Sequence, residues 1–91
     1  MKKAVKVHIS GTVQGVFFRA FVKKNADEFG LKGFVRNLED GRVEAYFEGP
    51  TESIKKMIEL CKKGPPHSIV KDVYVQEEKI QGMKDFKILH I

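Results

Sequence analysis

Residues 4–22 read "AVKVHISGTVQGVFFRAFV", and this stretch decides the first half of the fold. Over residues 4–10, apolar and polar side chains alternate, which is typical of a β-strand with one buried face. Two glycines follow within residues 11–15, and the apolar residues after them recur at the spacing of an amphipathic helix. That helix is predicted over residues 18–29, and Gly30 stands where helices commonly end in a left-handed residue. The stretch therefore predicts a strand, a glycine-containing loop and a helix.

A hairpin is predicted after this helix. The stretch "LKGFVRNL" at residues 31–38 indicates its first strand, and the Asp-Gly pair at residues 40–41 favours a tight turn. Over residues 43–48, small and apolar side chains alternate with polar or amphipathic ones, which indicates the second strand. We therefore expect one face of the hairpin to be solvated, the face that carries Glu44, Tyr46 and Glu48.

The second half of the chain repeats the helix and strand patterns. The stretch "PTESIKKMIELCKKG" at residues 50–64 predicts a helix with one apolar stripe, capped by the Thr51 hydroxyl and closed by Lys62, Lys63 and Gly64. The stretch "SIVKDVYVQEE" at residues 68–78 indicates a fourth strand, and "FKILHI" at residues 86–91 indicates a short terminal strand. The elements thus follow one another as strand, helix, strand, strand, helix, strand.

This order predicts an α+β fold of the ferredoxin-like type, a split β-α-β sandwich (βαββαβ). The expected sheet is antiparallel, with two helices on one face and a short C-terminal strand. A chain of 91 residues buries somewhat more than ~60% of its unfolded surface, which is enough for one hydrophobic core. We therefore predict a single domain over residues 1–91.

Charge and composition narrow the class of protein. The net charge of +5 and the isoelectric point near 9.4 favour anionic partners, without choosing among nucleic acids, membrane surfaces and small phosphates. No apolar run approaches the roughly 20 residues that span a bilayer, so we expect a cytoplasmic protein with no membrane partner. Cys61 is a single cysteine, and His8, His67 and His90 lack metal-ligand spacing, so no disulfide, metal or cofactor is expected. These four residues are predicted to lie outside the functional site.

The glycine-containing loop predicts an anion site. A helix N-terminus presents unpaired backbone N–H groups and a partial positive charge, and glycines let such donors converge. Arg19 falls in the first helical turn, where its guanidinium adds a planar set of donors. Gly11 and Gly15 do not have the pattern of a Walker loop or a dinucleotide fingerprint. The same residues also fit a plain turn followed by a surface arginine, and the pattern alone leaves both interpretations open.

Two longer stretches resemble a known family. "SGTVQGVFFR" at residues 10–19, followed by "GFVRNLEDGRVEAYFEG" at residues 33–49, is similar to the acylphosphatase family. The similarity continues through "GPPHSIV" at residues 64–70 and covers essentially the whole chain. The terminal "FKILHI" matches more loosely, and Ser68 stands where the family often has alanine. Neither departure touches the residues that matter for the family's activity.

The resemblance implies an enzyme that hydrolyses the carboxyl–phosphate bond of small acyl phosphates, with inorganic phosphate as product or inhibitor. Family members bind the phosphoryl group through backbone N–H groups of the loop that matches residues 13–18, called the cradle loop below. The asparagine that matches Asn37 holds the attacking water in line with phosphorus. By this resemblance Arg19 and Asn37 are catalytic, and the binding backbone is that of Val13, Gln14, Gly15, Val16, Phe17 and Phe18.

The implied site has no obvious general base, and the chemistry explains why none is needed. An acyl phosphate expels a carboxylate, whose conjugate acid has a pKa near ~4, so the leaving group requires little protonation. A loose phosphoryl-transfer transition state also demands little of the nucleophile. The Asn37 amide orients water but takes up no proton at neutral pH. The expected reaction is a metal-independent single displacement, and the phosphate itself can take up the water proton.

Two other functions remain open. The same element order occurs in RRM-type RNA-binding modules, and "KGFV" at residues 32–35 is similar to part of their RNP1 stretch. RNP1 belongs on the third strand, however, where the acidic face expected over residues 43–48 is unsuited to phosphate backbones. No nucleic-acid partner is therefore expected. A non-catalytic phosphate-binding domain would have the same loop, and turnover distinguishes it from an enzyme.

Overall fold

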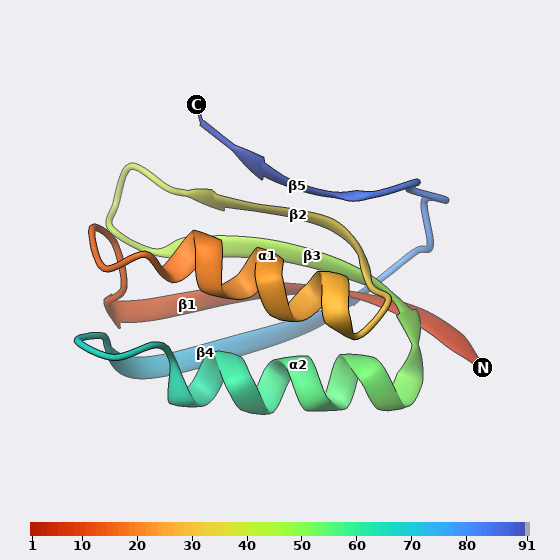
Figure 1. Cartoon of the computed structure of the whole chain (residues 1–91), viewed down its shortest axis with the longest axis horizontal. Coiled ribbons are helices and arrows are strands. Elements are labelled where there is room, and N and C mark those ends of the chain that lie inside the picture. Colours follow the sequence, from red (N-terminus) through yellow and green to blue (C-terminus); the bar gives the residue numbers. More distant parts are fainter. Residues whose placement is uncertain (91) are drawn as a thin grey trace.

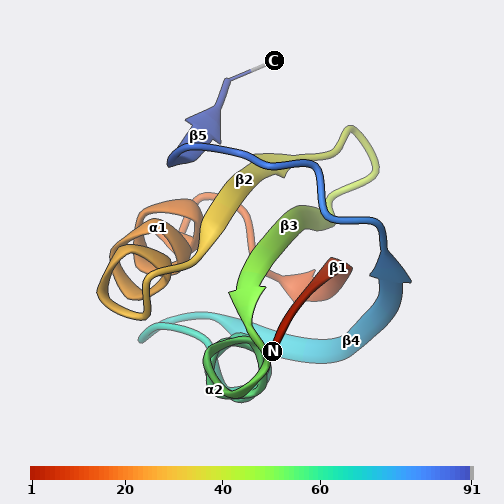
Figure 2. The same ribbon diagram turned by 90° about the vertical axis from the view of Figure 1, so that its right-hand side faces the viewer.

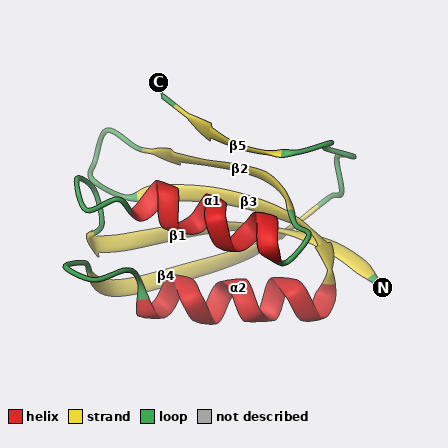
Figure 3. Ribbon diagram, viewed as in Figure 1, coloured by secondary structure: helices red, strands yellow, loops and turns green. Residues whose placement is uncertain are grey.

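The computed structural model describes residues 1–90 and contains two helices and five strands (Figures 1 and 3). The elements confirm the order expected from the sequence. They are β1 (Lys2–Thr12), α1 (Phe18–Glu28), β2 (Lys32–Asn37), β3 (Val43–Pro50), α2 (Thr51–Lys63), β4 (Ile69–Glu78) and β5 (Phe86–Leu89).

The five strands form one sheet in the order β4-β1-β3-β2-β5. The expected antiparallel pairing holds for four strands, because β1 pairs antiparallel with β3 and β4, and β2 pairs antiparallel with β3. The short terminal strand differs, since β5 lies parallel to β2 and makes the sheet mixed. The reason is the connection over residues 79–85, which carries the chain from the β4 edge to the β5 edge (Figure 2).

Both helices cover the same face of the sheet, as predicted (Figures 1 and 2). Side chains from this face and from the inner stripes of α1 and α2 form one core cluster. Cys61 lies fully buried in it, and burial raises the pKa of its thiol to about 12. The helix contributions to the core are Phe18, Val22 and Ala26 from α1, and Ile54, Met57 and Cys61 from α2.

The start of α2 differs from the expectation. Pro50 occupies the N-cap position, and no side chain caps the helix. Thr51 is instead the first helical residue, and its hydroxyl donates a hydrogen bond of 3.2 Å to the backbone oxygen of Met1. The end of α1 is as predicted, because Gly30 follows it with a φ of +72°.

The prediction of a solvated face on the hairpin was wrong. Glu44, Tyr46 and Glu48 are all buried, with exposed fractions of 7%, 0% and 6%. The β4–β5 connection lies over two of them, and Glu48 accepts hydrogen bonds from three of its backbone N–H groups, at 2.8 to 3.2 Å. Glu48 also accepts one from the Tyr46 hydroxyl at 2.7 Å. Burial raises the pKa of the Glu48 carboxyl, but these donors outweigh it and hold the pKa below its ordinary value.

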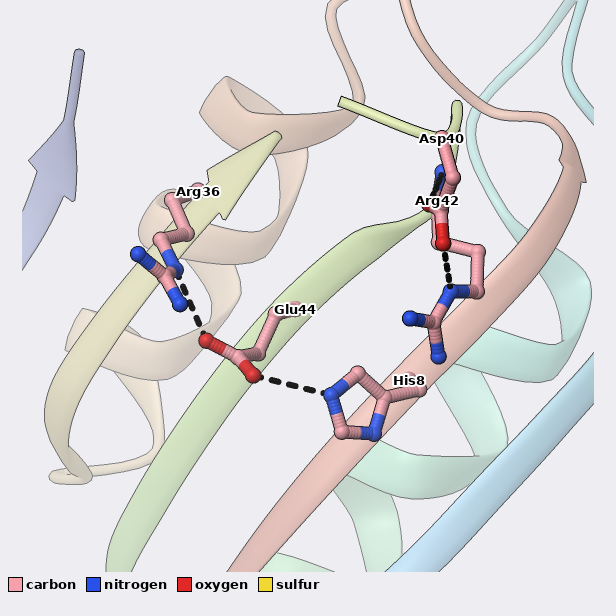
Figure 4. A network of polar contacts seen from close by, with 5 residues as sticks. All are labelled: His8, Arg36, Asp40, Arg42 and Glu44. Atoms are coloured by element: carbon pink, nitrogen blue, oxygen red, sulfur yellow. Dashed lines mark hydrogen bonds and ion pairs between the residues drawn. The ribbon is translucent and has the colours of Figure 1, made fainter. Parts of the chain in front are cut away.

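The buried Glu44 carboxylate lies in a second network on the same face, with two partly exposed partners (Figure 4). His8 Nε2 lies 2.8 Å from one of its carboxylate oxygens, and Arg36 Nε donates to the other at 2.7 Å. His8 is thus a half-buried strand residue that contacts a carboxylate, and it lies outside the cavity described below. Burial raises the pKa of Glu44, and the hydrogen bonds from His8 and Arg36 more than offset it, so the net shift is downward.

None of the helices within residues 1–90 is long and apolar enough to cross a membrane.

Candidate active site

The cradle loop follows the last residues of β1, just after the strand changes its pairing register. The ladder between β1 and β4 has an irregularity between Ser10 and Gly11, and Gly11 has a φ of +127°. A Cβ atom on Gly11 would lie 2.1 Å from the backbone oxygen of Ile69, so no side chain fits there. This close approach of two backbones lets β1 stay paired with β4 past the irregularity, up to Thr12, where the strand ends.

The loop leads into α1 through a left-handed residue. Phe17 is the N-cap of α1, with a φ of 61° and a ψ of 26°, a conformation that costs a bulky residue on the order of 1 to 3 kcal/mol. No side chain caps this helix N-terminus. The N–H groups of the first turn are therefore left for a ligand or for solvent, at the positive end of the helix dipole.

Arg19 is held by the end of β5. Its Nη1 donates long hydrogen bonds of 3.3 Å to the backbone oxygen of Leu89 and 3.3 Å to His90 Nδ1. These partners lie about seventy residues further along the chain. The guanidinium is thus oriented by a strand that only the sheet brings close to α1.

Asn37 lies at the end of β2, on the wall of the same pocket as Arg19. Its Oδ1 atom is buried and finds no hydrogen-bond donor within residues 1–90. Leaving a buried acceptor unpaired costs about 1 to 3 kcal/mol, and such costs are characteristic of functional positions.

Gln14 ties the cradle loop to the β2–β3 turn. Its side-chain amide donates two hydrogen bonds, of 2.8 Å to the backbone oxygen of Leu38 and of 2.9 Å to that of Arg42. Leu38 directly follows Asn37, so these bonds set the loop relative to the Asn37 carboxamide. Gln14 contributes a side chain here, a role that the sequence analysis had not assigned to it.

A cavity of about 310 Å³ collects most of the residues singled out from the sequence. Those on its wall are Val13, Gly15, Phe17, Phe18, Arg19 and Asn37. Gln14 and Val16 are not on the wall, because Gln14 faces the β2–β3 turn and Val16 packs against the core. Three further wall residues, which the sequence analysis missed, are Ala20, Ile88 and His90.

The position of His90 departs from the expectation that it lies outside the functional site. It reaches the cavity because β5 pairs with β2, and no local pattern around residue 90 signals that pairing. The other residues set aside are placed elsewhere, and residues 1–90 contain no group of three or more His, Cys, Asp or Glu side chains suited to a metal ion.

The cavity combines donors for an anion with a carboxamide side chain. The α1 N-terminus and the Arg19 guanidinium contribute positive potential and N–H groups, and Asn37 contributes a carboxamide. Much of the remaining wall is apolar. This arrangement suits a small anionic group such as a phosphoryl group, together with one polar molecule held by the amide.

Comparisons with known proteins agree with this geometry. The acylphosphatase family model matches residues 5–88. A relative named acylphosphatase from Syntrophus aciditrophicus is 48% identical over 91 residues, which cover 99% of this chain and 95% of that protein.

Solved structures give the same result. The crystal structure of acylphosphatase from Bacillus subtilis superposes with a TM-score of 0.94 at 40% identity, covering 99% of this chain and 100% of that one. An acylphosphatase from Coxiella burnetii gives a TM-score of 0.94 at 39% identity, covering 97% and 93% of the two chains. The chain therefore belongs to the acylphosphatase family, enzymes that hydrolyse acyl phosphates.

Proposed function

We propose that the 310 Å³ cavity is where this acylphosphatase binds the phosphoryl group of its substrate and hydrolyses the carboxyl–phosphate bond. The observation that carries the proposal is the meeting of Arg19, Asn37 and the α1 N-terminus on one wall. These groups come from α1 and β2, two different elements of the fold.

In this proposal, Arg19 and the backbone N–H groups of the cradle loop hold the three non-bridging phosphoryl oxygens. Charge is spread over these oxygens in the transition state, so fixed donors aimed at them lower the barrier. The hydrogen bonds to Leu89 and His90 support this role, because they hold the guanidinium before the substrate arrives.

Asn37 is proposed to direct the attacking water. Its carboxamide lies on the cavity wall, and an amide can hold a water by hydrogen bonds while it takes up no proton at neutral pH. The water oxygen forms a new bond to phosphorus while the bond between phosphorus and the bridging oxygen breaks. The electron pair of the broken bond stays on the bridging oxygen, which leaves as part of the carboxylate. The water proton passes to the phosphate, so the step calls for no general base and no metal.

Inorganic phosphate is the product of this reaction, and it is proposed to inhibit as well. It retains the oxygens that the cradle loop and Arg19 bind, so it competes with the substrate for the same donors. The acyl phosphate itself is a small molecule, of which this part of the site needs to bind only the phosphoryl end.

The test is steady-state hydrolysis of benzoyl phosphate in excess chelator, with a phosphate monoester in parallel. We expect turnover of the acyl phosphate alone. Arg19→Ala should lower kcat/KM by about 10² to 10³-fold, and Arg19→Lys should restore little, because an ammonium does not reproduce the planar donors. The matched control is Lys24→Ala, which removes an exposed cation from the same helix. Near-normal turnover of the lysine variant would contradict the proposed role of Arg19.

A further inference from the structure

The cavity is larger than its proposed phosphoryl ligand. Its volume of about 310 Å³ equals roughly ten water molecules at about 30 Å³ each, whereas a phosphoryl group has four heavy atoms. The wall beyond the donors includes the residues Phe17, Ala20 and Ile88. The site therefore has room, and an apolar surface, for part of the substrate other than the phosphoryl group.

Phe17 is the least explained residue of this wall. Its side chain is 86% exposed, while that of its neighbour Phe18 is 1% exposed and belongs to the core. Its backbone has a φ of 61°, a conformation that glycine or asparagine adopts more readily. A large ring is thus placed in water on a strained backbone, and packing within residues 1–90 accounts for neither feature.

We propose that the ring of Phe17, together with Ile88, is the contact surface for the acyl group of the substrate. The enzyme would then favour acyl phosphates with aromatic or extended apolar acyl groups over acetyl phosphate. This inference rests on the proposed function of the cavity. It adds a residue that sets substrate preference, in a loop whose backbone is already proposed to bind phosphate.

The connectivity of the substrate supports this placement. One bridging oxygen joins phosphorus to the acyl carbon, so a phosphoryl group held by cradle-loop N–H groups puts the acyl group beside the side chains of that loop. Phe17 is the N-cap residue at those N–H groups, and its ring is the large exposed apolar surface there. A ring that loses water against an aromatic or aliphatic acyl group gains stabilisation in proportion to the apolar area covered.

The experiment compares kcat/KM for benzoyl phosphate and acetyl phosphate, expressed as a ratio. The variants are Phe17→Gly, which removes the ring and relieves the strain, and Phe17→Asn, which removes the ring and keeps a residue that tolerates the left-handed conformation. The ratio is informative because damage to the phosphoryl site lowers both rates alike. The control is Ile80→Asn, which removes an apolar side chain 51% exposed and away from the cavity.

We expect wild-type enzyme to favour benzoyl phosphate, and both Phe17 variants to lower the ratio about tenfold, equivalent to about 1.4 kcal/mol. Phe17→Leu should keep most of the preference, and Ile80→Asn all of it. An unchanged ratio in both ring-deleted variants would overturn the inference. This holds also if kcat/KM falls by the same factor for benzoyl phosphate and acetyl phosphate. Failure of the wild-type enzyme to hydrolyse either substrate would overturn the proposed function itself, which is a distinct outcome.

Discussion

Substitutions of Gln14 test whether its two side-chain hydrogen bonds fix the position of the cradle loop. Its amide donates to the backbone oxygens of Leu38 and Arg42 at 2.8 and 2.9 Å. Each such bond contributes about 1 kcal/mol net, so Gln14→Ala should lower the free energy of unfolding by about 2 kcal/mol. Gln14→Glu keeps the shape, loses both donors and turns a carboxylate toward two carbonyl oxygens. We expect it to cost more than the alanine variant.

The assay is denaturant unfolding of the three proteins at neutral pH, with kcat measured alongside. The control is Gln76→Glu, the same chemical change on the exposed edge of β4, which should stay within about 0.5 kcal/mol of wild type. Acidification should narrow the gap between the glutamate and alanine variants at residue 14, because a protonated carboxyl regains one donor. A glutamate variant as stable as wild type would show that the loop is held by something other than these bonds.

Three further predictions follow from the buried groups. Asn37→Ala should lower kcat while inhibition by inorganic phosphate stays similar, and a loss of phosphate affinity would place Asn37 among the phosphate ligands instead. Burial raises the pKa of Glu44, but the hydrogen bonds from His8 and Arg36 outweigh burial, so the pKa is lowered in the folded state. The ionised Glu44 carboxylate therefore stabilises the folded protein at pH values above its ordinary pKa of 4.5. This stabilisation is lost as pH falls through the lowered value, so Glu44→Gln should flatten the acid decline in unfolding free energy measured below about pH 4.5. Cys61 is fully buried and burial raises its pKa to about 12, so a disulfide reagent at pH 8 should label it only as fast as the protein unfolds.

Local sequence patterns predicted the helices and strands, because the periodicity of apolar residues along each element indicates which of its faces is buried. The same reasoning failed on the outer face of β3, which carries Glu44, Tyr46 and Glu48. Alternation of apolar and polar residues indicates that one face of a strand is buried. It does not indicate whether other parts of the chain also bury the polar face. Here that cover comes partly from residues 79–83, some thirty positions away and without a periodic pattern, and partly from polar partners such as His8.

The residues of the candidate active site also differ in whether the sequence could predict them. Arg19 and the cradle loop form one continuous motif, so their proximity follows from chain connectivity, and Asn37 came from the resemblance to a family. Ile88 and His90 reach the cavity through the parallel pairing of β5 with β2, which depends on where the β4–β5 connection crosses. The hydrogen bonds from the Gln14 side chain depend on the position of the turn after β2. These are long-range outcomes of packing, and no short stretch of sequence encodes them.

The hydrogen bonds between Arg19 and the end of β5 also bear on how the molecule is made in the cell. The two partners are about seventy residues apart, and β5 arrives only after the connection anchored by Glu48 has crossed the sheet. A nascent chain that has emerged from the ribosome only as far as β4 has its cradle loop but lacks the strand that orients the arginine. Contacts of such large sequence separation form slowly, because loop-closure entropy opposes them. On the role proposed for Arg19, catalytic competence should therefore require β5 to be paired with β2, and chains that have not yet formed this pairing should leave acyl phosphates intact.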